Sequence, residues 1–149
     1  MDELERRTRA ESPEGRQLAD DIAENPICCL TFDPAIPAAV VVWRRYATSL
    51  QLRFINEKLL ELIVKHRARK LLADDTGFSA VDRADQAWIF QEWMPRAVEA
   101  GLKVVASKRP AGYYGRVTVQ NVQAHLEPIK IEVFEDLPSA REWLIRYEA

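Results

Sequence analysis

Cysteine and histidine are scarce in this chain of 149 residues, which has two of each. Cys28 and Cys29 are adjacent, and neighbouring strand residues point to opposite faces, so we expect two thiols rather than a disulfide. Buried or half-buried thiols are typical of a reducing compartment. His66 and His125 have no ligand-type partner at metal-site spacing, so we predict a surface or capping role for both, and no metal or other cofactor.

Long apolar runs are also missing. No stretch approaches the ~20 apolar residues that a membrane-spanning helix needs. The first fifteen residues, MDELERRTRAESPEG, lack the apolar core of a secretory signal. We therefore expect no transmembrane segment and a cytoplasmic location. Neither sign of charge dominates, with 21 Lys and Arg against 23 Asp and Glu, so we expect no nucleic-acid partner.

What charge there is lies unevenly along the chain. Residues 1–25 hold eight acidic and four basic side chains and few large apolar ones. We interpret them as an N-terminal arm, helical or loose, ahead of one domain over residues 26–149. Asn25-Pro26 marks the boundary, because the residue before a proline is pushed out of the helical region.

Five apolar runs predict strands. Two come first, bounded by prolines, and are expected to pair as a hairpin. Three more follow, each short and rich in Val, Ile or Leu. The predicted strands are Ile27–Asp33, Ala39–Arg44, Lys70–Asp74, Lys103–Ser107 and Lys130–Phe134.

Helical periodicity fills the gaps between and after these strands. We expect helices over Leu50–His66, from Asp82 to about Ala100 with a kink or break near Trp93-Met94 caused by Pro95, and after Asp136. Val117, Val122 and Leu126 suggest a short fourth helix, and a strand over Val117-Thr118-Val119 is the alternative. The order predicts an α/β fold in which an initial β-hairpin and parallel βα units form a mixed five-stranded sheet, covered by about four helices.

Four pieces of the chain follow one another in a characteristic order. They are the VVVW strand before the long helix, the KLLADD strand with its loop, the helix and strand start from Trp88 to Lys103, and FEDLPSAREWL. In this order they resemble the STAS domain superfamily, in its SpoIIAA-like (STAS/SEC14) branch of small bacterial proteins. Antagonists in this superfamily carry an Asp-Ser-Ser/Thr-Gly motif, whose phosphorylated hydroxyl releases a partner kinase. Here Asp82 matches, but Arg83 and Ala84 replace the hydroxyl positions, so the phosphorylation switch is not supported.

Seven residues are candidates for a ligand or partner surface. The loop after the third strand offers acids and an aromatic, the following helix two tryptophans, and the 108–116 loop two tyrosines. Trp88 and Trp93 are five residues apart on a helix, so we expect one at the core and the other at an edge or pocket. The candidates are Asp75, Phe78, Asp82, Trp88, Trp93, Tyr113 and Tyr114.

The acidic loop allows a second interpretation. Asp74, Asp75, Asp82 and Asp85 carry the oxygen ligands that Mg²⁺ or Ca²⁺ prefers. Because no regular ligand spacing is present, we favour turn formation and helix capping for these carboxylates over a cation site.

Two functions from different classes remain. The first is a non-enzymatic STAS-like regulatory module that docks a protein partner or a second copy of itself, with a homodimer as one form. The second, implied by the SEC14-like side of the resemblance, is a carrier or sensor of an apolar small molecule or lipid, in a pocket walled by the Trp88/Trp93 helix. No catalytic constellation is found in the sequence, and we do not expect an enzyme.

Overall fold

A computed structural model describes residues 27–78, 81–110 and 129–149. Their core is a single five-stranded sheet in which the spatial order of the strands follows the chain, β1-β2-β3-β4-β5. Strands β1 and β2 are antiparallel, and every later neighbour pair is parallel. The bounds of the strands are β1 Cys28–Asp33, β2 Ala38–Trp43, β3 Lys70–Asp74, β4 Val104–Lys108 and β5 Lys130–Phe134.

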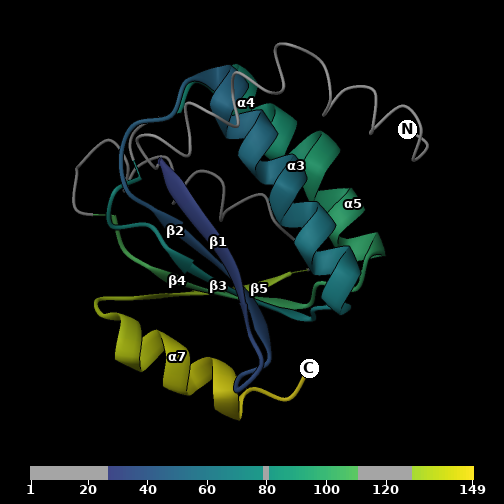
Figure 1. Ribbon diagram of the computed structural model, residues 1–149, viewed down its shortest axis with the longest axis vertical. Helices are drawn as coiled ribbons and strands as arrows, with labels where there is room; N and C mark the ends of the chain where they lie inside the picture. The colour runs from purple at the N-terminus through teal and green to yellow at the C-terminus, as the bar shows by residue number, and fades with distance from the viewer. Residues whose placement is uncertain (1–26, 79–80, 111–128) are drawn as a thin grey trace.

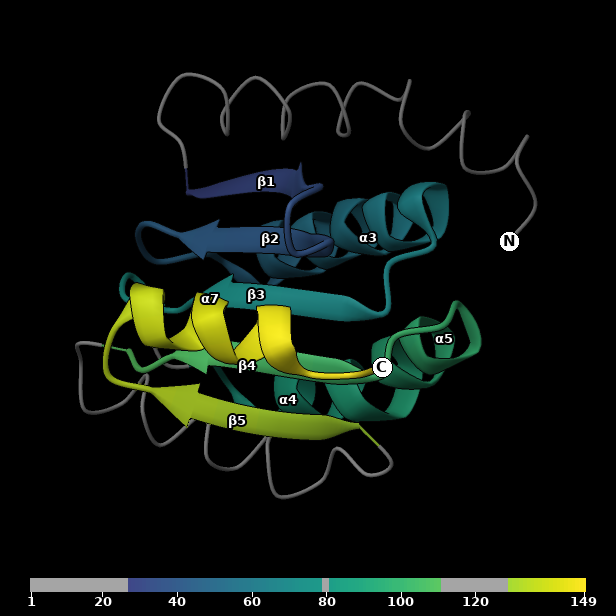
Figure 2. The same ribbon diagram turned by 90° about the horizontal axis from the view of Figure 1, so that it is seen from below.

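Helices cover both faces of this sheet (Figures 1 and 2). Helix α3 (Ser49–His66) and a second helical run lie on one face. That run consists of α4 (Arg83–Trp88), η1 (Ile89–Trp93) and α5 (Met94–Glu99). Among the helices of the described residues, α7 (Leu137–Arg146) is the one on the other face, where it packs against β3, β4 and β5. No helix within the described ranges is long and apolar enough to cross a membrane.

The predicted fold class is therefore confirmed: an initial hairpin, then parallel strands, with helices on the sheet. Strand bounds differ from the predicted ones by at most one residue at either end. The suggested fourth helix around Val117–Leu126 and the arm over residues 1–25 lie outside the described residues. Both cysteines are free, Cys28 buried and Cys29 half-buried, as the sequence predicted.

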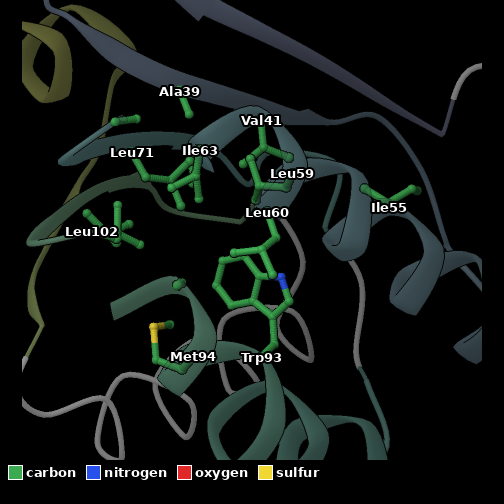
Figure 3. Packing of buried hydrophobic residues seen from close by; sticks show 14 of the residues in the cluster. Ala39, Val41, Ile55, Leu59, Leu60, Ile63, Leu71, Trp93, Met94 and Leu102 are labelled. Atoms are coloured by element: carbon green, nitrogen blue, oxygen red, sulfur yellow. The ribbon is translucent and has the colours of Figure 1, made fainter. Parts of the chain in front are cut away.

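Two apolar clusters hold the layers together because alternate strand residues face opposite helices. The larger cluster joins α3 and the 83–99 helical run to the sheet, and Figure 3 shows Trp93 and Met94 in it beside residues from α3 and the strands. The smaller lies under α7, around Leu72, Ala106 and Leu144. Lys70 is buried there, and its Nζ donates a hydrogen bond to the Leu144 carbonyl at 2.5 Å. This charge meets the negative pole of α7.

Side-chain caps begin the helices, and those at Asp82 and Asp136 lie where the sequence predicted helix starts. Thr48 and Gln51 form a reciprocal capping box at the start of α3. Asp82 accepts a hydrogen bond from the Asp85 amide and begins α4, and Asp136 does the same for α7. After α5 the chain turns at Gly101, whose positive φ of 115° is easily adopted by glycine.

The predicted kink at Pro95 takes a different form. The chain stays helical through Trp93-Met94, but residues Ile89–Trp93 form a π-helix, in which the Met94 amide donates to the Ile89 carbonyl five residues back. Proline has no amide proton, and its ring crowds the carbonyl of the preceding turn. A wider turn ahead of Pro95 accommodates this without ending the helix.

Helix α3 ends at Arg67, whose φ of 51° places a non-glycine residue in the left-handed region. Because a Cβ disfavours this conformation, we expect Arg67→Gly to raise the free energy of unfolding by about 0.5–1 kcal/mol. Urea denaturation of both proteins measures the change. Arg69→Gly, two residues on and also exposed, is the control and should be neutral or destabilising. A destabilised Arg67→Gly protein would contradict the prediction.

Candidate functional site

The carboxyl ends of β2, β3 and β4 meet at one edge of the sheet, where ligand sites of α/β proteins are usually found. Backbone hydrogen bonds tie the three ends together: the Gly77 amide donates to the Trp43 carbonyl at 3.1 Å, and the Asp75 amide donates to the Lys108 carbonyl at 3.2 Å. A Cβ on Gly77 would lie 2.4 Å from the carbonyl carbon of Arg44. Only glycine allows this close approach, so the loop after β3 is held against the end of β2.

Asp75 lies below the protein surface at these strand ends. Its side chain is buried, and Ser107 on β4 donates a hydrogen bond to its Oδ2 at 2.5 Å. Burial raises the pKa of Asp75 to about 6, the Ser107 hydrogen bond opposes the rise, and the negative charge of Asp74 adds to it. Burial also raises the pKa of the Cys28 thiol to about 12. Asp75 is therefore a buried carboxyl group that is held by Ser107 and has a pKa well above the ordinary value of an aspartate.

The other acids of this region have separate partners. Asp74 accepts a hydrogen bond from Thr76, whose hydroxyl oxygen also accepts one from the Lys108 ammonium; both distances are 2.6 Å. Asp85 is buried and accepts from Ser49 at 2.6 Å and from the Arg53 guanidinium at 3.0 Å. Over residues 27–78, 81–110 and 129–149, no group of three or more His, Cys, Asp or Glu side chains is arranged to hold a metal ion.

The two candidate tryptophans occupy different environments, which agrees with the prediction from their spacing. Trp93 is only 2% exposed and belongs to the core, where its indole Nε1 donates to the Asn56 carbonyl at 2.6 Å. Trp88 is half-buried at the edge of the same cluster, with the Arg53 guanidinium 5.3 Å from its ring centre. Asp82 is exposed and caps α4. The structure thus separates Trp93, a core residue, from Trp88 and Asp82.

Phe78 packs edge-on against Trp43, with ring centres 5.4 Å apart. Together they line a small hollow between the β2–α3 connector and the loop after β3, with Arg45, Ala47, Leu52 and Val81. The volume of the hollow that the centre of a water molecule can occupy is about 10 Å³. This is on the order of the space that one water molecule needs. An acyl chain would fill far more. Tyr113 and Tyr114 lie outside the described residues.

Sequence reasoning missed the most exposed part of this edge. The β2–α3 connector lies at the upper left of Figure 1. Tyr46 in this connector and Leu50 in the first turn of α3 are both 60% exposed. Arg44 and Arg45 precede them and are also exposed. One sequence feature could have indicated this exposed surface. It is the segment RRYATSLQLR, residues 44–53, which has three arginines and no acidic residue.

This edge therefore combines a rigid base, a buried carboxylate and an exposed apolar and basic connector. No family model and no curated protein matches the chain, so its assignment depends on the geometry described above.

Proposed function

We propose that the chain is a non-enzymatic, STAS-like docking module that binds a protein partner through the connector between β2 and α3. The observation that carries this proposal is the exposure, at 60% each, of Tyr46 in the connector and Leu50 in the first turn of α3. The connector is anchored to the strand ends. Tyrosine and arginine are over-represented among residues that dominate binding energy at interfaces. Loops held by a rigid scaffold are also where binding residues concentrate.

The assignment to the SpoIIAA-like branch is part of this proposal. It is supported by the hairpin followed by parallel βα units and by the sequence pieces that resemble the branch. The phosphorylation switch of the antagonists is not included. Asp82 begins α4 as a helix cap, and the two residues that follow it, Arg83 and Ala84, have no hydroxyl.

Site-specific photocrosslinking tests the docking function. Benzoylphenylalanine is placed at position 50, and at position 64 as the matched control, because Leu50 and Val64 are exposed apolar residues of the same helix, at 60% and 53%. Irradiation in the native host should give a discrete protein adduct from position 50 and none from position 64. A second copy would appear as an adduct of twice the 17.1 kDa chain mass.

Adducts that Tyr46→Ser leaves unchanged, or equal adducts from both positions, would contradict this function. The alternative, an apolar carrier, is separated by native mass spectrometry of protein purified without detergent. A bound mass of a few hundred daltons that is lost on denaturation would favour the carrier. A clean protein mass would favour the docking module.

A further inference from the structure

The connector and the first turn of α3 form a basic surface, defined here as the 44–53 surface: Arg44, Arg45, Tyr46, Leu50 and Arg53. The segment carries three positive charges and no negative one. The Arg53 side chain is 42% exposed even though its Nε contacts Asp85. Charge that remains exposed at an interface favours a partner of the opposite sign, and it speeds the encounter.

Apolar groups lie among these charges. Tyr46 and Leu50 are the most exposed large hydrophobic residues in the described part of the chain. The half-buried Trp88 ring lies beneath the Arg53 guanidinium, and the hollow lined by Trp43 and Phe78 adjoins the connector. A partner that neutralises the arginines would also cover these apolar surfaces, and removing them from water favours binding.

Resting on the proposed docking function, we infer that the 44–53 surface binds an acidic protein segment that carries an apolar or aromatic anchor side chain. Negative charge lies beside this surface, because Asp74 interacts electrostatically with Arg44 and the exposed Asp82 follows in the loop after β3. A broad polyanion, such as a nucleic-acid duplex or a charged membrane, would overlap these carboxylates. A narrow segment can place its acids on the arginines and its anchor on Tyr46 and Leu50.

A phage-displayed library of random 12-residue peptides, selected against the full chain, tests this inference. We expect enriched peptides with several Asp or Glu and at least one Leu, Phe or Trp. Binding of such a peptide should fall at least tenfold for the Arg44→Glu/Arg45→Glu protein and for the Tyr46→Ser/Leu50→Ser protein. It should weaken several-fold between 50 and 300 mM salt. Arg44→Gln/Arg45→Gln is used if charge reversal impairs folding.

The Val64→Ser/Ile145→Ser protein is the matched control, because both residues are exposed apolar side chains on other parts of the surface; its binding should not change. A peptide with Lys in place of Glu should regain affinity for the charge-reversed protein. Failure to enrich peptides, enrichment of uncharged ones, or binding that ignores the arginine changes would overturn the inference. Arginine-dependent binding of a 20-nucleotide RNA or of phosphatidylserine vesicles, without acidic peptides, would also overturn it.

Different results would refute the docking function and the acidic character of the partner. A partner crosslinked at position 50, in the absence of acidic peptides, would leave the docking function standing and refute only the acidic character of the partner. Loss of both signals would refute both proposals.

Discussion

Replacing Trp93 with alanine should lower the free energy of unfolding by about 3–5 kcal/mol, the range for removing a large buried aromatic side chain. The Trp93 ring is only 2% exposed and lies in the cluster that joins α3 to the sheet (Figure 3). The substitution would also remove the indole donor at 2.6 Å from the Asn56 carbonyl. Urea denaturation followed by circular dichroism gives the free energy for each variant.

Two further variants separate packing from hydrogen bonding. Trp93→Phe keeps most of the ring and removes the donor, so we expect a loss of about 1–2 kcal/mol. Trp88→Ala removes a half-buried ring at the edge of the cluster and should cost clearly less than Trp93→Ala. Equal losses at positions 88 and 93 would mean that Trp93 does not occupy the core in the way described.

The second large effect is on the pH dependence of stability. The pKa of Asp75 is raised to about 6 in the folded chain, chiefly by burial, whereas an unfolded aspartate has a pKa of about 3.9. The folded state therefore holds the proton more tightly than the unfolded state. Its stabilising contribution is complete below about pH 4 and is lost as the pH rises through 6, a change on the order of 3 kcal/mol.

Asp75→Asn is the matched variant, because its amide oxygen can accept the same hydrogen bond from Ser107 and carries no charge. Unfolding free energies of both proteins are measured from pH 4.5 to pH 7.5. We expect the variant to be the more stable protein by about 2–3 kcal/mol at pH 7.5, and the difference to shrink toward pH 4.5. A difference independent of pH would show that folding does not raise the pKa of Asp75.

Local sequence signals predicted most of the fold because they depend on neighbours in the chain. A proline on either side bounds the first strand in the sequence. The Thr48 and Asp82 side chains cap helices by accepting a hydrogen bond from the amide three residues further along the chain. The π-helix was not predicted in this way. Pro95 predicted a disturbance of the helix here, but a proline is compatible with a kink, a break or a wider turn, and the sequence does not distinguish among them.

The candidate site was only partly predictable for the same reason. Asp75 and Phe78 were chosen because they follow a buried strand, and both belong to the strand-end edge. Burial of Asp75 depends on Ser107, which is 32 residues away. Lys70 begins a predicted strand, and no local pattern shows that α7 covers its side chain. In the sequence, the segment that contains Tyr46 and Leu50 looks like an ordinary connection between a strand and a helix. Only the structure shows that no described element buries these two side chains.

The agreement between spatial and sequential strand order has a consequence for synthesis on the ribosome. Each strand emerges beside a neighbour that has already been made, so the sheet can be extended one strand at a time without rearrangement. The face that α7 covers cannot be completed in this way, because residues 137–146 come after all five strands. At ordinary translation rates, Leu144 is synthesised roughly ten seconds after Leu72. During that interval the nascent chain exposes an apolar surface, so chaperone contact is most useful to this protein then.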